Sequence, residues 1–166
     1  MRILIAVLAL AVSAGSAFAQ QTVILVRHAE RADSKPGVPP SMASDPDLSD
    51  AGRARAEALA AMLKDAKIAT IIATEYKRTQ QTAAPVAKTL GVPVTTIKAN
   101  QNEDIVKAVR AASGNVLIVG HSNTIPEVVK ALGAPPLDAI RDEEYDNLYI
   151  VTLGTPLSIV RLHFKP

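Results

Sequence analysis

Hydrophobic residues are arranged along this chain in two alternating patterns. Short runs rich in Val and Ile occupy residues 23–26, 68–73, 92–97 and 116–119 and predict strands. The runs at 23–26 and 116–119 are unbroken, which is typical of strands buried on both faces of a sheet. Between the runs, apolar residues recur at intervals of three and four, which predicts helices over 49–66, 78–90, 102–113 and 126–132. Two more strands, at 148–153 and 158–164, flank Gly154-Thr155-Pro156 and predict a closing hairpin.

A few residues mark the ends of the predicted helices. Ser49 and Asn102 are suitable N-caps, and Gly91 is a suitable C-terminal stop. Pro85 falls inside the second helix, where we expect a kink or an irregular turn. Helical spacing places the following side chains of the first helix toward the core: Ala51, Ala58, Leu59, Met62, Leu63 and Ala66.

The order of these elements predicts the fold class. Repeated strand–helix units place successive strands parallel and cover both faces of the sheet with helices. We therefore expect an α/β fold, a three-layer α/β/α sandwich with a mostly parallel sheet and a C-terminal hairpin. In such sheets, ligands bind at the carboxyl ends of the strands.

The first nineteen residues differ from the rest of the chain. Arg2 precedes an apolar run over residues 3–12, and Ala17-Phe18-Ala19 has the small-x-small pattern of a cleavage site. The run is shorter than the ~20 residues that cross a bilayer, so a cleaved signal peptide is favoured over an uncleaved anchor. We expect residues 1–19 to be the signal peptide, residues 20–166 to form one domain, and the protein to be periplasmic or secreted.

Composition argues against several functional classes. The formal net charge is only +2, basic residues are scattered, and aromatic residues make up 3% of the chain, so no nucleic-acid partner is expected. The chain has no Cys, which excludes disulfides and thiolate chemistry. After signal cleavage, no membrane association is expected.

Chemically versatile side chains follow three of the predicted strands. The first strand runs into Arg27-His28, the second into a segment that contains Arg78, and the fourth into His121. Two of the 3 histidines therefore lie where parallel sheets bind ligands. The third, His163, falls in the final hairpin.

These side chains suit phosphoryl transfer without a metal or a cofactor. A neutral imidazole, as in His28, can attack phosphorus in line and form a phosphohistidine. The guanidinium groups of Arg27 and Arg78 stay charged and can each bind two phosphate oxygens. A protonated His121 can donate a further hydrogen bond, and the helix after it adds backbone N–H donors for an anion.

The motifs around these residues resemble those of the histidine phosphatase superfamily, also called the phosphoglycerate-mutase-like family. That family has an Arg-His pair after its first strand, a Ser/Thr-x-x-x-Arg-x-x-Gln-Thr-Ala segment, and a second His after a hydrophobic strand and Gly. The matching residues are Arg27-His28, then Thr74, Arg78, Gln81, Thr82 and Ala83, and finally Gly120-His121. Leu48-Ser49-x-x-Gly52 also looks like the family's Leu-Thr-x-x-Gly helix start, and the likeness extends from Val23 to about Gly133.

The resemblance implies specific roles. His28 would be the phosphorylated nucleophile, and Arg27, Arg78 and His121 would hold the phosphate. The fold would be built around a six-stranded, mainly parallel sheet. We expect a metal-independent hydrolase of phosphomonoesters or phosphohistidine, whose partner is a phosphorylated small molecule or a phosphoprotein.

The chain departs from some branches of this family. Ala29 follows His28 where many members have Gly. The acid phosphatase and phytase branch has Asp directly after the second His, where this chain has Ser122. The mutases carry long insertions that keep water from the site, whereas residues 98–104 form a short stretch here. Hydrolysis is therefore favoured over mutase-type phosphotransfer.

The sequence offers several candidates for the general acid. Glu103 and Asp104 lie where the mutases place an acidic residue, but acids in the first turn of a helix also complement its dipole. Asp33 and Glu30 lie close to the nucleophile in sequence, and Asp146 precedes a predicted strand. Each of the five is a candidate proton donor for the leaving oxygen.

Three polar residues are candidates for binding the substrate. Thr74 can contact phosphate through its hydroxyl. Asn123 and Thr124 follow the second catalytic-type His, and they can either reach the phosphate or cap the following helix.

Two other functional classes compete with catalysis by phosphohistidine. A non-catalytic binder of phosphoryl ligands on the same fold would not need the nucleophile. A metal site could combine His28 and His121 with a carboxylate such as Asp33 or Glu103, but two adjacent guanidinium groups would repel a dication. No metal is therefore expected.

Overall fold

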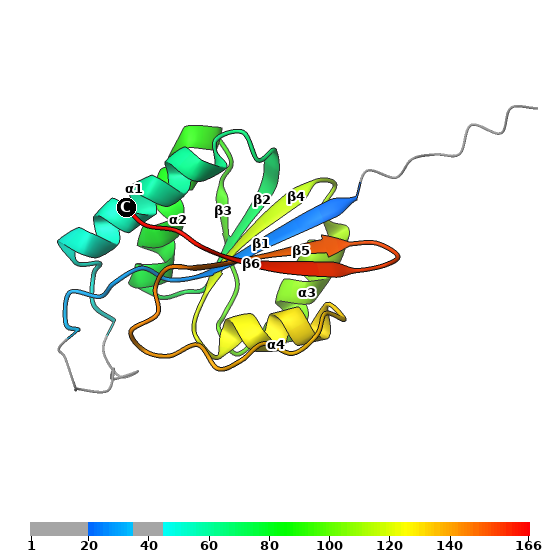
Figure 1. Ribbon diagram of the computed structural model, residues 1–166. Helices are drawn as coiled ribbons and strands as arrows, with labels where there is room; N and C mark the ends of the chain where they lie inside the picture. The colour runs from blue at the N-terminus through cyan, green and yellow to red at the C-terminus, as the bar shows by residue number, and fades with distance from the viewer. Residues whose placement is uncertain (1–19, 35–44) are drawn as a thin grey trace, which may run out of the picture.

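The computed structural model describes residues 20–34 and 45–166 (Figure 1). The expected signal peptide, residues 1–19, lies outside the described residues. Within the described part of the chain, no helix is long and apolar enough to cross a membrane.

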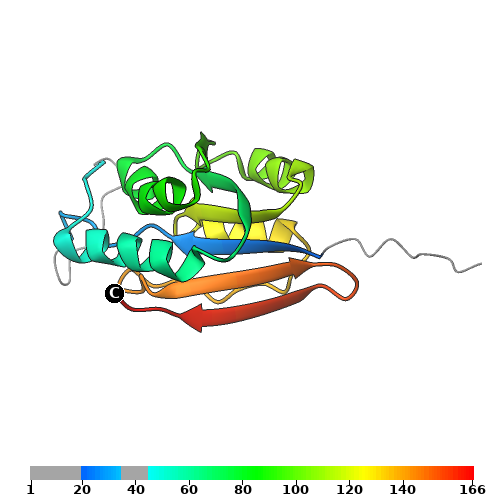
Figure 2. The same ribbon diagram turned by 90° about the horizontal axis from the view of Figure 1, so that it is seen from above.

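Six strands form one sheet, in the order β3-β2-β4-β1-β5-β6. The strands are β1 (Gln21–Arg27), β2 (Ile68–Ala73), β3 (Val94–Thr96), β4 (Asn115–Gly120), β5 (Asn147–Leu153) and β6 (Ser158–His163). The first four pair in parallel, whereas β5 is antiparallel to both of its neighbours. The predicted six-stranded, mostly parallel sheet with a terminal hairpin is thus confirmed, and β6 forms its outer edge in Figure 2.

Two helices cover each face of the sheet. Helices α1 (Asp50–Leu63) and α2 (Lys77–Leu90) pack on one face, and α3 (Asn102–Ala111) and α4 (Thr124–Ala131) on the other (Figure 1). In β1, Ile24 and Val26 point to the first pair of helices, whereas Val23 and Leu25 point to the second. Burial on both faces explains the unbroken apolar run of β1. The predicted three-layer α/β/α sandwich is confirmed.

The inward face of α1 differs from the prediction. Ser49 caps the helix as predicted, but the helix ends at Leu63, and Met62 is 47% exposed. The predicted inward positions Ala51 and Met62 are therefore wrong. The buried residues of α1 are Gly52, Ala56, Leu59, Ala60 and Leu63. The buried face of α1 is rotated relative to the predicted face because Gly52 packs against the backbone of Glu30. This contact needs a residue without a side chain.

Other element ends also shift. Asn102 is the first residue of α3 and makes no capping hydrogen bond, because Gln101 occupies the N-cap position. Helix α4 begins at Thr124, two residues before the predicted start. Helix α2 runs through Pro85 without a break and ends at Gly91 in the left-handed conformation, as its stop signal predicts.

The sheet order brings three strand ends together. Because β4 lies between β1 and β2, the carboxyl ends of these parallel strands are neighbours. The backbone N–H of His28 donates to Gly120 O at 2.9 Å, and that of Thr74 donates to Val119 O at 3.3 Å. Pairing therefore continues beyond β1 and β2 and holds the residues that follow the strands side by side.

We predict that Gly52→Ala destabilises the protein. A Cβ atom at this position would collide with the backbone carbonyl oxygen of Glu30, which is not free to move because it accepts the N–H of Ser49 at 2.9 Å. Overpacking of this kind costs about 1–3 kcal/mol, although Ala favours a helix over Gly by about 1 kcal/mol. Urea unfolding measures the change, with the exposed Glu57→Ala in the same helix as control. A stabilisation of Gly52→Ala by about 1 kcal/mol, the gain that helix propensity alone predicts, would contradict the contact.

Candidate active site

His28 lies directly after β1, is 3% exposed, and has its ring fixed by the adjacent backbone. Its Nδ1 is 2.8 Å from the carbonyl oxygen of Ala29. Because a carbonyl oxygen only accepts hydrogen bonds, Nδ1 carries the proton and Nε2 keeps its lone pair. Burial, and then the charges of Arg27, His121 and Arg78, lower the pKa of His28 to about 2. The ring is therefore neutral at neutral pH, with Nε2 in the nucleophilic form.

Helix α2 anchors the segment that carries His28. The backbone N–H of Ala29 donates to Thr82 Oγ1 at 2.9 Å. Thr82 Oγ1 in turn donates to Arg78 O at 2.7 Å, one turn earlier in the helix. One buried hydroxyl thus joins the nucleophile segment to the helix that carries Arg78, which gives the Thr of the Gln-Thr-Ala motif a physical role.

A chain of hydroxyl groups orients His121, which follows β4 and is 3% exposed. Arg78 Nη2 lies 3.5 Å from His121 Nδ1, and since a guanidinium only donates, Nε2 carries the proton. Nε2 donates to Thr74 Oγ1 at 2.7 Å, and that hydroxyl donates to Thr79 Oγ1 at 3.0 Å. Thr79 Oγ1 then donates to the carbonyl oxygens of Thr74 and Tyr76. The chain fixes both the ring and its tautomer.

The charge state of His121 differs from the prediction. Burial, followed by the charges of Arg78, Arg27 and Arg31, lowers the pKa of His121 to about 3. A protonated His121 is therefore the wrong expectation for the site without ligand. A bound phosphate dianion would offset these positive charges and raise the pKa.

Aromatic rings enclose the two imidazoles. The ring centroids of His28 and His121 are 5.3 Å apart, with planes inclined at 63°. Tyr76 packs edge-on against His121 at 5.1 Å, and Tyr145 lies 6.1 Å from His28. The described structure therefore brings together the two histidines that the strand-end argument predicted.

Arg27 is 4% exposed and is held by the loop before β5. Its Nη1 donates to the carbonyl oxygens of Arg141 at 2.8 Å and Asp142 at 2.9 Å, and its guanidinium carbon lies 4.4 Å from the ring centroid of Tyr145. Its Nε is buried and has no hydrogen-bond partner among the described residues. The loop thus positions the guanidinium and leaves one N–H available to an anion.

Two further arginines complete a buried cationic cluster. Arg78 is 0% exposed; its guanidinium lies over the ring of Tyr76 at 4.3 Å, and its Nη1 is 3.6 Å from Asp45 Oδ1. Arg31 is 3% exposed and binds Asp33 with two hydrogen bonds of 2.8 and 2.7 Å. Sequence reasoning missed Arg31, because it belongs to no motif. The available signal was a second basic residue in the Arg-His-Ala-Glu-Arg run.

Two of the predicted general acids are engaged elsewhere. Glu30 receives hydrogen bonds from Arg55 Nε and Nη2, the shortest 2.6 Å. Asp146 Oδ2 lies 3.2 Å from His163 Nδ1 at the end of β6. These pairs attach α1 and the hairpin to the rest of the fold, and Arg55 also donates to the carbonyl oxygen of Phe164 at 2.9 Å. Figures 1 and 2 both show the C-terminal segment passing beside α1.

The remaining candidate acids separate into two groups. Glu103 and Asp104 lie on the exposed first turn of α3, where they complement the helix dipole, and Asp104 accepts a hydrogen bond from Gln101 at 3.0 Å. Asp33 lies at the cationic cluster, paired with Arg31. Burial lowers the pKa of Arg78, and the negative charge of Asp33 is one of the groups that partly offset this lowering. The structure therefore places Asp33, and not the α3 acids, beside the site.

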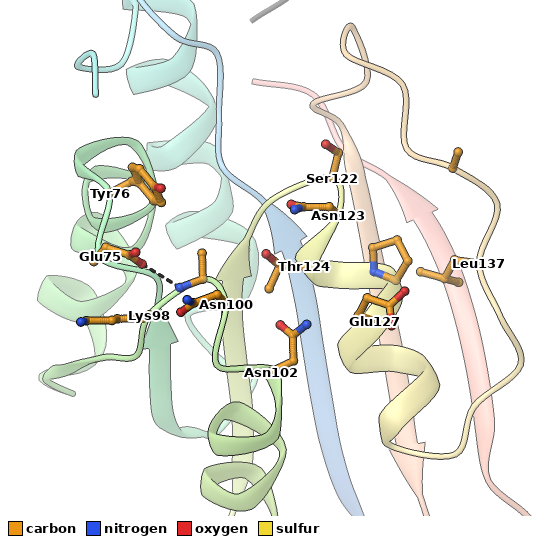
Figure 3. A pocket seen from close by; sticks show the side chains of 13 residues that line it. Glu75, Tyr76, Lys98, Asn100, Asn102, Ser122, Asn123, Thr124, Glu127 and Leu137 are labelled. Atoms are coloured by element: carbon orange, nitrogen blue, oxygen red, sulfur yellow. Dashed lines mark hydrogen bonds between the residues drawn. The ribbon is translucent and has the colours of Figure 1, made fainter. Parts of the chain in front are cut away.

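A cavity of about 760 Å³ is lined by Ser122, which follows His121, and by Tyr76, which packs against its ring. Asn123 and Thr124 line it (Figure 3). Thr74 is not among the lining residues, because it is buried as the hydrogen-bond partner of His121. Across the described residues, no three His, Asp or Glu side chains gather where they could hold a metal.

The lowered pKa values predict the state of both rings in solution. As pH falls, a group with a lowered pKa stays neutral longer, so both rings should remain neutral at about pH 5, where an ordinary His is charged. Imidazole nitrogen NMR should show the Nδ1–H tautomer for His28 and the Nε2–H tautomer for His121, with His28→Gln and His121→Gln providing the assignments. Protonation of either ring above about pH 6 would contradict the burial argument.

One family of known proteins matches part of this sequence. Residues 23–100 match the family model of the histidine phosphatase superfamily (branch 1). No curated protein sequence gives a significant match.

Solved structures of similar fold cover most of the chain. A putative phosphohistidine phosphatase SixA from Agrobacterium tumefaciens has 20% identity and a TM-score of 0.62, covering 87% of this chain and 99% of its own. A mycobacterial glucosyl-3-phosphoglycerate phosphatase has 15% identity and a TM-score of 0.66, with 81% and 91% covered. A putative alpha-ribazole-5'-P phosphatase from Escherichia coli has 15% identity and a TM-score of 0.64, with 87% and 96% covered. At these identities, the likeness is one of fold.

The family match contains the nucleophile strand and the segment with Arg78, and the fold supplies His121 from outside the matched residues. By this sequence match over residues 23–100, and by its fold, the chain is similar to the histidine phosphatase superfamily (branch 1).

Proposed function

We propose that this protein hydrolyses phosphomonoesters, or phosphohistidine, through a covalent phosphohistidine on His28, without a metal. One observation carries the proposal: His28 donates from Nδ1 to Ala29 O, so that a neutral Nε2 lone pair sits among buried guanidinium groups. A nucleophile needs that lone pair, and a phosphoryl group needs those charges. The names of the similar structures, which include sugar-phosphoglycerate and phosphohistidine phosphatases, support a phosphorylated substrate.

The first step transfers the phosphoryl group to the protein. Nε2 of His28 attacks phosphorus in line; the N–P bond forms while the bond from phosphorus to the leaving oxygen breaks. Arg27 and Arg78 stabilise the charge on the equatorial oxygens. The leaving oxygen takes a proton from an acid and departs as an alcohol.

The second step returns the site to its starting state. A water molecule gives its proton to the conjugate base of that acid and attacks phosphorus. The N–P bond breaks, its electron pair returns to Nε2, and inorganic phosphate leaves. The net reaction is phosphomonoester plus water giving alcohol plus phosphate. The connection from β3 to α3, where the mutases have their insertion, spans only residues 97–101, which favours transfer to water over return to a product.

The N-terminal leader supports a place of action outside the cytoplasm. We include in the proposal that residues 1–19 direct export and are removed, so that the domain acts in the periplasm or outside the cell. Edman sequencing or intact mass of protein secreted from cells tests this: a mature chain starting near Gln20 is expected, and a cytoplasmic full-length chain would contradict it.

Substitution of the nucleophile tests the proposed function. His28→Asn should reduce kcat on p-nitrophenyl phosphate by at least about a thousandfold, because removing a catalytic nucleophile has effects of this size or larger. His163→Asn, a change of the third histidine, which is outside the strand-end site, serves as the control and should keep wild-type turnover. Full activity of His28→Asn would contradict the proposed function. Loss of wild-type activity with a chelator would point to the metal alternative.

We further propose Asp33 as the general acid, since it lies at the cationic cluster. Asp33→Asn should then lower kcat on alkyl phosphates about a hundredfold, because their leaving oxygen needs a proton. Turnover of p-nitrophenyl phosphate should change far less, since its phenolate leaves unprotonated. Glu103→Gln is the comparison variant. Equal losses by Asp33→Asn on both substrates would contradict an acid role, and a selective loss in Glu103→Gln would assign the role there.

A further inference from the structure

The cavity shown in Figure 3 is lined by residues that adjoin His121 in sequence or in space, although His121 itself is not among the lining residues. Its walls are the turn after β2, the segment before α3, the first turn of α4 and part of the loop before β5. Ser122, a lining residue, directly follows His121, and the lining residue Tyr76 packs its ring against that imidazole. A substrate whose phosphate contacts His28 and His121 would therefore place its remaining part in this cavity.

Two buried atoms of the cavity have no hydrogen-bond partner among the described residues. They are Asn102 Oδ1, at the start of α3, and Thr124 Oγ1, at the start of α4. Thr124 is only 1% exposed. Buried polar atoms are almost always hydrogen-bonded, since leaving them unpaired destabilises the fold. Two such atoms on facing elements of one cavity indicate groups that a ligand satisfies.

The chemistry of these two atoms favours a ligand that carries hydroxyl groups. An amide oxygen such as Asn102 Oδ1 only accepts, whereas the Thr124 hydroxyl can donate or accept. The rest of the wall combines the neutral polar side chains of Asn100, Ser122 and Asn123 with the apolar side chains of Ala99, Pro126, Leu137 and Ala139. A ligand that carries several hydroxyl groups matches this wall better than an apolar one does.

The charges of the wall disfavour anionic ligands. Its carboxylates are Glu75 and Glu127, against the single ammonium of Lys98. Glu75 also accepts the backbone N–H of Ala99 at 2.8 Å, which fixes a carboxylate at the wall. A second phosphate or a carboxylate on the ligand would meet this negative charge. A nucleobase would find Tyr76 as the one aromatic lining residue, with the Arg78 guanidinium already over its ring.

We infer that this cavity is the leaving-group site and takes a neutral, polyhydroxylated alcohol, so that the substrate is a sugar or polyol monophosphate. The inference rests on the proposed phosphatase function and adds the substrate class. Asn102 and Thr124 bind the hydroxyl groups of the leaving alcohol, and the phosphoryl transfer at His28 proceeds as described above.

The test compares substrates and near-isosteric variants. The substrates are glucose-6-phosphate, fructose bisphosphate, a phosphohistidine peptide and p-nitrophenyl phosphate, whose leaving group has no hydroxyl to bind. Asn102→Leu and Thr124→Val remove the two polar atoms with little change in shape, and Lys107→Gln, exposed on α3 outside the cavity, is the matched control. In each cavity variant, the ratio of kcat/KM for glucose-6-phosphate to that for p-nitrophenyl phosphate should fall about tenfold or more. The control should keep the wild-type ratio.

The outcomes separate the substrate class from the function itself. If wild type turns over p-nitrophenyl phosphate but prefers fructose bisphosphate or the phosphohistidine peptide to glucose-6-phosphate, the substrate class is overturned and the phosphatase function stands. The same holds if both cavity variants leave the ratio unchanged. If wild type hydrolyses none of the four, the proposed function fails, and the leaving-group site fails with it. Thermal unfolding of each variant confirms that it is folded.

Discussion

The site depends on burying positive charge beside uncharged imidazoles. Arg27, Arg31 and Arg78 are each at least 96% buried, and guanidinium groups do not escape burial by losing a proton. Carbonyl oxygens, carboxylates and tyrosine rings hold them in place, yet the three cations still repel one another and both histidines resist protonation. A phosphoryl dianion would relieve this repulsion. The same charges keep the His28 lone pair free to attack.

The fold produces this arrangement through its strand order. With β4 between β1 and β2, the residues after three parallel strands share one rim, and backbone pairing extends to His28 and Thr74. Contacts with the helices then fix the positions of the residues that follow β1. Thr82 joins the nucleophile segment to α2, and Gly52 lets α1 approach the next residues of that segment. Preorganisation of this kind lowers the cost of positioning charged groups during the reaction.

The sequence predicted the parts of this structure that depend on local patterns. Runs rich in Val and Ile located the strands, Ser49 and Gly91 marked helix ends, and the positions of His28 and His121 after parallel strands predicted that they lie together. These predictions were possible because periodicity and capping are local, and sheet connectivity follows from the order of elements.

Features that depend on tertiary burial were not predictable. The neutral state of His121 follows from desolvation and three arginines that only the fold assembles, and Arg31 belongs to no motif. Asn102 has the residue type of a helix cap, but the chain turns one residue earlier, so its amide lines the cavity instead. For His121, the decisive neighbours are arginines that are far away in the sequence.

The central claim is that His28 becomes phosphorylated during turnover. Rapid acid-free quenching of the wild-type protein with substrate, followed by peptide mass spectrometry, tests it most directly. The account predicts a phosphate on the peptide that contains His28, bound through nitrogen and therefore labile to acid, which disappears as substrate is exhausted. Turnover without any phosphoprotein, or phosphate on a different residue, would contradict it.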